Sequence, residues 1–125
     1  MLSNVATVLA GLIGAGCVFI GVLAFLAPQA AAGFGIPGTP TEDRGFRAWL
    51  TVKAMRDLGC GLFVFVLIAG ATAHLLGWFM LAMTVIPVGD MVIVLRSKGP
   101  RATAYGVHGA TAAVILVVSV LLLIA

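Results

Sequence analysis

The chain has 125 residues, of which 62% are hydrophobic and only 9% are charged. An ordinary soluble domain carries roughly a quarter charged residues, so this chain has too few polar side chains to cover a surface that faces water. The composition therefore excludes a soluble globular domain and indicates an integral membrane protein. The formal net charge of +3 reflects topology and contact with anionic lipid headgroups, and it gives no reason to expect nucleic-acid binding.

Four apolar runs predict four membrane-spanning helices. Each run is near the ~20 residues that a helix needs to cross a hydrocarbon core, whereas a barrel would show short alternating segments. The expected fold class is all-α: a polytopic bundle of four transmembrane helices forming a single membrane domain over residues 1–125. The expected helices cover about residues 5–27, 40–69, 75–95 and 103–124.

The first apolar run also permits a second interpretation, as a signal peptide. Ala27 to Gly33 (APQAAAG) offers the small residues that a signal peptidase cleaves. The run has no Lys or Arg before it, however, and it is longer than the roughly 7 to 15 residues of a typical signal core. We therefore expect it to stay in the protein as the first helix.

The basic residues predict the orientation of the helices. Lys and Arg occur between the first two helices and between the last two, whereas the two ends of the chain and the turn at 70–74 have none. Because basic loops stay in the cytoplasm, we expect a multi-pass protein of the cell membrane with both termini outside. The basic loop residues are Arg44, Arg47, Arg96, Lys98 and Arg101.

The second helix has a recognisable start signal. Thr39, Pro40 and Glu42 fit the N-cap, the first and the third helical positions, which predicts a start near Pro40. Its first two turns should lie in the cytoplasmic interface, with Trp49 at the headgroup level. The apolar, glycine-rich residues 33–38 just before it are either a lid that dips into the membrane or a simple connector, and the sequence leaves both open.

Ionisable residues inside the apolar runs are the main clue to function. At about 100° per residue, one third of the circumference of the second helix holds Trp49, Lys53, Arg56, Asp57 and Cys60. The third helix adds Asp90, just after Pro87, and the fourth adds Tyr105 and His108, one turn apart. All these ionisable groups fall in the cytoplasmic half of the bilayer, so we expect them to meet in one cavity.

Each of these residues also has a purely structural interpretation. Lys53 is near enough to the interface to snorkel, Arg56 and Asp57 could pair only to stabilise the bundle, and His108 could bond another helix. Tyr105 fits an interfacial aromatic. Asp90 is harder to explain structurally, because a carboxylate in a membrane helix costs about 2.5 to 3.5 kcal/mol on insertion scales.

The two cysteines carry little functional signal. Cys17 and Cys60 lie inside the first and second predicted helices and fit packing residues, with a disulfide between them left open. The chain shows no haem-ligand pair, no Gly-rich nucleotide loop and no zinc-type cluster. We therefore expect no metal site and no cofactor.

Two motifs, VKAMRDLGCG at 52–61 and IPVGDMVIVLR at 86–96, together with His108 and Gly109, suggest a family. With them, the chain resembles a family of small four-helix integral membrane proteins, bacterial and fungal, known as a domain of unknown function. The resemblance spans nearly the whole chain. Fungal members resemble components of pathways that make oxidised polyketides or terpenoids, which implies enzymes acting on lipophilic epoxides or related intermediates.

The residues themselves suggest the same chemistry. Two carboxylates bridged by a guanidinium suit the opening of an epoxide by water, because one can act as general base while the other, protonated, donates to the departing oxygen. Asp57, Asp90 and Arg56 are the expected catalytic residues, by analogy with the trio of small soluble epoxide hydrolases, an analogy of chemistry and not of fold. Substrate or water would be positioned by Lys53, Tyr105 and His108.

We thus expect a membrane-embedded hydrolase or isomerase whose lipophilic substrate enters from the bilayer. A second hypothesis is a proton-coupled exporter that uses Asp57 or Asp90 as the titrating carboxylate and assembles as a homodimer. It requires a polar path to both faces, and the outer half of the predicted helices is apolar. A third hypothesis is an accessory subunit whose ionic face binds a partner chain.

Overall fold

The computed structural model describes all residues, 1–125, and is helical over most of its length without any strand. The all-α class predicted from the sequence is confirmed. In chain order the elements are α1 (Leu2–Leu26), the 3-10 helix η1 (Pro28–Phe34), α2 (Arg44–Gly70), α3 (Ala73–Met83), α4 (Val85–Arg96), α5 (Arg101–Thr103), the π-helix η2 (Ala104–Gly109) and α6 (Ala110–Ile124).

Three helical stretches are long and apolar enough to cross a membrane: Leu2–Leu26, Ala73–Arg96 and Arg101–Ile124. They indicate a membrane protein. The remaining long helix, α2, has 27 residues but differs in composition, because Lys53, Arg56 and Asp57 interrupt its apolar sequence.

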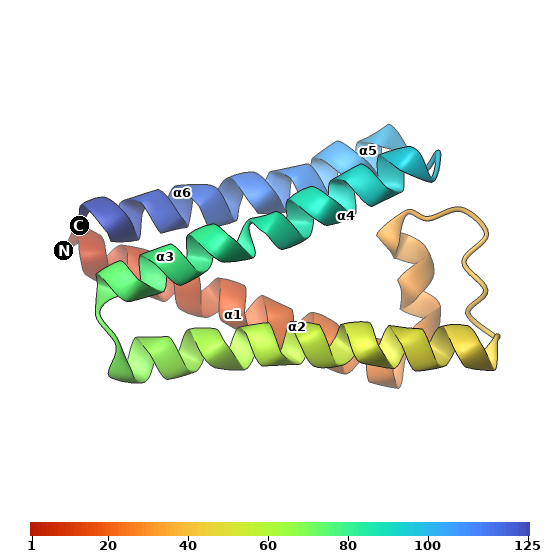
Figure 1. Ribbon diagram of the computed structural model, residues 1–125, viewed down its shortest axis with the longest axis horizontal. Helices are drawn as coiled ribbons and strands as arrows, with labels where there is room; N and C mark the ends of the chain where they lie inside the picture. The colour runs from red at the N-terminus through yellow and green to blue at the C-terminus, as the bar shows by residue number, and fades with distance from the viewer.

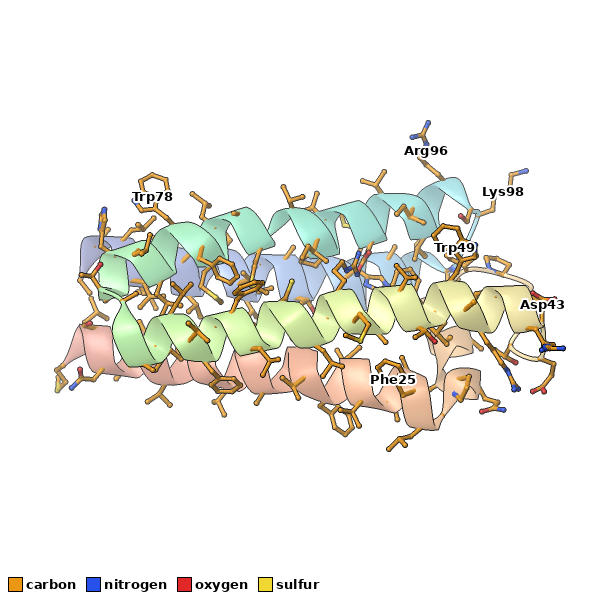
Figure 2. The ribbon with its side chains drawn as sticks, turned by 60° about the horizontal axis from the view of Figure 1, so that its bottom comes forward. Phe25, Asp43, Trp49, Trp78, Arg96 and Lys98 are labelled. Carbon is orange, nitrogen blue, oxygen red and sulfur yellow. The ribbon has the colours of Figure 1, made fainter.

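The helices form two layers that separate toward one end of the molecule (Figure 1). One layer holds α1 packed along α2, and the other holds α3 and α4 beside α6 and η2. The layers are joined mainly by packing of α1 against α6, whereas α2 and α4 have little packing between them. The chain ends lie together at one end of the bundle, and both basic connections lie at the other (Figures 1 and 2).

A compact apolar core fills the half of the bundle that contains the chain ends. It consists of nine buried residues: Ala6, Ala10, Val64, Leu76, Met80, Met83, Ile115, Val118 and Leu122. One buried polar group lies beside them, and it is satisfied, because the Ser119 hydroxyl donates to the carbonyl of Gly77 at 3.0 Å. No buried side-chain nitrogen or oxygen lacks a hydrogen-bond partner, as is usual in a well-packed interior.

Two glycines allow α1 and α2 to approach closely. A Cβ atom added at Gly61 would lie 2.5 Å from the carbonyl oxygen of Gly14 and 2.7 Å from Cγ2 of Val18. Small residues at such a crossing let membrane helices pack backbone to backbone. The contact holds the layer that carries Lys53, Arg56 and Asp57.

We predict that Gly61→Ala destabilises the folded protein by about 2 kcal/mol, because the new methyl group meets backbone that has no room to move. Gly59→Ala is the matched control. A Cβ there would meet nothing within 4 Å, so the better helix propensity of alanine should stabilise α2 by about 0.5 to 1 kcal/mol. Unfolding of both variants in detergent micelles measures the difference, and equal stability would contradict the close crossing.

The predicted start of the second helix is wrong by four residues. The helix begins at Arg44, with Asp43 as its N-cap, whose carboxylate accepts a hydrogen bond from the Phe46 amide at 2.7 Å. Aspartate is among the best N-cap residues. Thr39 instead donates its hydroxyl to the carbonyl of Ile36 at 2.6 Å, in a turn where Gly38 has a positive φ of 69°.

The third predicted helix is interrupted where its proline requires it. Pro87 has no amide hydrogen to bond the carbonyl four residues earlier, at Met83. The chain separates α3 from α4 at Thr84, whose hydroxyl donates to the carbonyl of Met80 at 3.2 Å. This break precedes the turn of α4 that carries Asp90.

Candidate functional site

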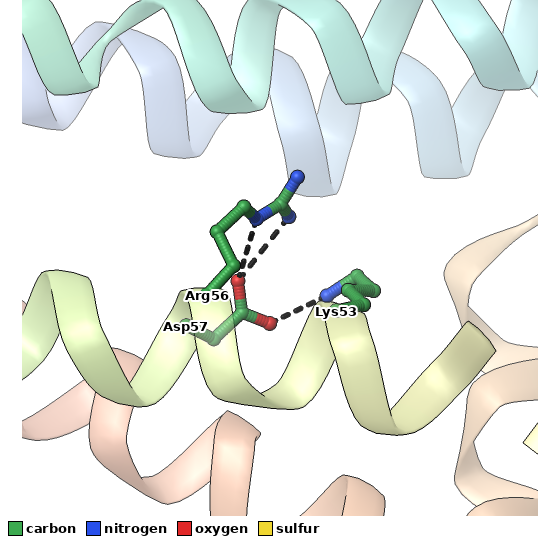
Figure 3. A network of polar contacts seen from close by, with 3 residues as sticks. All are labelled: Lys53, Arg56 and Asp57. Carbon is green, nitrogen blue, oxygen red and sulfur yellow. Dashed lines mark hydrogen bonds and ion pairs between the residues drawn. The ribbon is translucent and has the colours of Figure 1, made fainter. Parts of the chain in front are cut away.

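Asp57 is the centre of an ionic cluster on α2 (Figure 3). Its Oδ2 accepts from Lys53 Nζ at 2.6 Å, and its Oδ1 accepts from Arg56 Nε and Nη2 at 3.3 and 3.2 Å. Lys53 is four residues before Asp57, so the helix itself places both side chains on one face. Both carboxylate oxygens of Asp57 therefore bind a cationic side chain.

The cluster is buried at the carboxylate and more open at the cations. The Asp57 side chain is 12% exposed, against 30% for Lys53 and 43% for Arg56. The guanidinium points away from α2 toward the helices of the other layer (Figure 3). Because Nε and Nη2 bond to Asp57, Nη1 has no protein partner and can donate to a ligand or to water.

Asp90 lies on α4, in the opposite layer, and is half-buried. Its carboxyl group makes no hydrogen bond and no ion pair within the protein. It is nevertheless close enough for the charges of Arg56, Lys53, His108 and Asp57 to act on it. Asp57 and Asp90 thus belong to different layers, on α2 and α4, within the range of each other's charge.

His108 is buried and reaches a segment that sequence reasoning did not assign to the site. Its Nε2 lies 2.8 Å from the carbonyl oxygen of Phe34, and the two rings have centroids 4.5 Å apart. Because a carbonyl only accepts, Nε2 must carry the hydrogen that it donates. The Lys53 ammonium lies 5.5 Å from the centroid of the Phe34 ring, a cation–π distance. Phe34 therefore links His108 to the ionic cluster.

Tyr105 does not join these residues. Its side chain is 56% exposed, on the outer surface of η2. In an α-helix, Tyr105 and His108 would share a face, but the hydrogen bonds of a π-helix span five residues and widen the turn. Three residues then cover a smaller arc, so Tyr105 points outward while His108 points inward.

Trp49 and Cys60, the other two residues of the predicted face of α2, differ in their exposure. Trp49 is 73% exposed, so its side chain does not point into the interior as the helical spacing predicted. No helix of the opposite layer packs over that part of α2. Cys60 is half-buried, as is Cys17 on α1, and both are free thiols. Cys17 is close enough for the charges of Asp57, Lys53 and Arg56 to act on it.

Two surface cavities lie apart from the cluster. A cavity of about 290 Å³ at the basic end is lined by Ala32, Gly35, Ile36, Pro37, Gly38, Thr39 and Pro100. A mainly apolar groove of about 380 Å³ between α1 and the η2–α6 helix is lined by Ile13, Gly106, Val107, Ala110, Thr111, Val114 and Ile115. Neither cavity is lined by an aspartate.

The molecule is thus an all-α protein in which helices of membrane-spanning character surround an ionic cluster. The chain belongs to the family described as Domain of unknown function (DUF4267), whose model matches residues 14–122. The family membership predicted from the two motifs is confirmed, and the match includes every candidate site residue. No curated protein and no solved structure matches the chain.

Proposed function

We propose that the protein is a membrane-embedded enzyme that opens the epoxide ring of a lipophilic small molecule, as a hydrolase or an isomerase. One observation carries the proposal: the Asp57 carboxylate is paired with Lys53 and Arg56, while Asp90 lies on the opposite layer without a cation of its own. Two carboxyl groups in such different surroundings suit the roles of base and acid.

In the proposed reaction, Asp57 accepts a proton from a water molecule whose oxygen attacks one carbon of the epoxide. The bond from that carbon to the ring oxygen breaks, and protonated Asp90 donates its proton to the departing oxygen. The product is a vicinal diol, and proton transfer through water from Asp57 to Asp90 restores the starting state. The free Nη1 of Arg56 would donate to the epoxide oxygen as charge develops on it.

An isomerase would use the same acid without the water. Asp90 would again protonate the departing oxygen, while Asp57 would remove a proton from the substrate carbon next to the opening ring. An allylic alcohol would result, with no oxygen taken from the solvent. The same two carboxyl groups thus support both outcomes, and the source of the product's oxygen atoms distinguishes them.

We further propose that four helical rods cross the membrane, with α2 as the fourth. At about 1.5 Å per residue, the 27 residues of α2 reach about 40 Å, which exceeds a hydrocarbon core of about 30 Å. Trp49 and Trp78, both exposed, lie at opposite ends of the bundle (Figure 2), as expected for aromatic residues at two interfaces. The basic end would face the cytoplasm and the chain ends the outside.

The apolar core favours an enzyme over the proton-coupled exporter. An exporter needs polar groups that lead from the site to both faces, whereas the half with the chain ends is filled by the nine core residues, and its one fully buried hydroxyl, that of Ser119, is satisfied. Access from one side and from the lipid suits an enzyme with a lipophilic substrate.

A single assay tests the proposal. The purified protein in lipid nanodiscs is incubated with 1,2-epoxyhexadecane or squalene 2,3-epoxide in water enriched in heavy oxygen, and products are analysed by mass spectrometry. A hydrolase gives a diol with one heavy oxygen atom, and an isomerase gives a rearranged product with none. Product formation no faster than in empty nanodiscs, together with pH-driven uptake of the same compounds by sealed proteoliposomes, would overturn the enzyme in favour of the exporter.

A further inference from the structure

Residues 28–38, here called the cap, are tied to the bundle at both ends. At the far end, Gln29 Nε2 donates to Glu42 Oε1 at 3.4 Å, and Glu42 Oε2 pairs with Arg47 Nη2 at 2.9 Å. At the inner end, Phe34 accepts the hydrogen bond of His108 and lies against its ring and against Lys53. The cap therefore bridges α2 and η2, which belong to different layers.

The cap packs closely against the connection between α4 and α5. Gly35 follows Phe34 with a positive φ of 103°, and a Cβ there would lie 2.8 Å from Cγ2 of Thr103. A Cβ added at Gly99 would collide with the carbonyl oxygen of Gly35. These glycines let the backbone turn and approach the α4–α5 connection closely, which directs the Phe34 ring inward.

The cap stands between the two layers at the basic end, where they have separated (Figure 1). The Phe34 ring lies between the Lys53 ammonium and the His108 imidazole. An aromatic ring at this position covers the ionic cluster on the side from which water would arrive. Phe34 is the side chain that contacts both His108 and Lys53.

We propose that Phe34 is the gate residue of the ionic cluster: with the cap seated, its ring shields the buried Asp57 carboxylate from water at the basic end, and release of the cap opens that path. In the context of the proposed function, the gate sets when water reaches the carboxyl groups. A substrate from the lipid could then bind before water enters.

The native thiol of Cys17 provides a test that needs no substrate. Cys17 lies within electrostatic reach of Asp57, Lys53 and Arg56, and a charged thiol reagent reaches it only through water. In a Cys60→Ala background in nanodiscs, the rate of Cys17 modification by 2-sulfonatoethyl methanethiosulfonate is measured by mass spectrometry. Phe34→Ala should raise this rate at least about tenfold, because loss of the ring contacts shifts the equilibrium between closed and open states.

Two further variants make the result decisive. His108→Phe keeps a ring but removes the donor to the Phe34 carbonyl, so it should also raise the rate. Phe25→Ala removes a ring of the same size from an exposed position on α1 and should leave the rate unchanged. If Phe34→Ala does not fold, Phe34→Leu and His108→Phe are measured in its place. Wild-type rates in the folded gate variants, or an equal increase in Phe25→Ala, would overturn the gate.

Labelling and turnover separate the two proposals. A protein that opens no epoxide but whose Cys17 becomes reactive in Phe34→Ala has a gate and lacks the proposed activity. A protein that opens epoxides while labelling ignores Phe34 has the activity and lacks the gate. Neither outcome depends on the identity of the natural substrate.

Discussion

Asp57→Leu is expected to destabilise the folded protein by about 3 kcal/mol. The substitution removes the only carboxylate that binds Lys53 and Arg56, and removing one partner of a buried ion pair leaves uncompensated charge. We place the value at the lower end of the usual range because both cations are partly exposed. Unfolding in mixed detergent micelles, followed by circular dichroism, measures the loss.

Asp90→Leu is the matched control for that prediction. Asp90 binds no cation directly, so its replacement by an apolar residue should be neutral or stabilising by about 1 kcal/mol or more. The triple variant Lys53→Met, Arg56→Leu, Asp57→Leu should recover most of the stability lost in Asp57→Leu, since apolar residues often replace buried ion groups without loss. Equal stabilities for Asp57→Leu and Asp90→Leu would contradict the ionic cluster.

Asp90→Asn is expected to lower the rate of epoxide opening by about 10² to 10⁴, the usual contribution of a general acid. Asparagine has nearly the same size and hydrogen-bonding shape but cannot release a proton to the departing oxygen. Since Asp90 makes no ion pair, the variant should fold as well as the wild type. Single-turnover rates with the epoxide that reacts fastest, measured on protein of matched stability, give the ratio.

Asp90→Glu is the informative companion of this variant. Glutamate restores a titratable carboxyl group on a longer side chain, so it should recover part of the rate that asparagine loses. Undiminished turnover in Asp90→Asn would remove Asp90 from the mechanism. Loss of turnover in both variants with no recovery by glutamate would show that the position of the carboxyl group matters as much as its chemistry.

The sequence predicted the class of the protein and the ionic cluster on α2 correctly. The low share of charged residues indicates that lipid surrounds the protein. The 3.6-residue period of an α-helix places Lys53 and Asp57 on one face, whichever helices pack beside them. These predictions depend on helix geometry and on the composition of the chain. Few details of tertiary packing can change them. That Asp90 meets Asp57 in one pocket stays a prediction, which rests on both residues falling at the same expected depth in the membrane.

The rest depended on contacts that no local pattern shows. Phe34 meets His108 across 74 positions of sequence, and the sequence leaves residues 33–38 open as either a lid or a simple connector, without linking Phe34 to the site. The outward position of Tyr105 results from η2, since a π-helix arises from the backbone bonding that the whole bundle selects. The start of α2 was misjudged because Asp43 competes with Thr39 as N-cap, and the turn at Gly38 favours Asp43.

The two layers are joined by the apolar core at one end and bridged by the cap at the other, so with the cap released they would open and close like a hinge. The apolar core is the point about which the layers would rotate. Asp57 on α2 and Asp90 on α4 lie on opposite layers, on the side of the core toward the basic end. A small rotation about the core therefore changes the separation of the two aspartates far more than it disturbs the packing within either layer. Substrates of different width could bind between the same two aspartates, because the angle between the layers would change while the site residues stay the same.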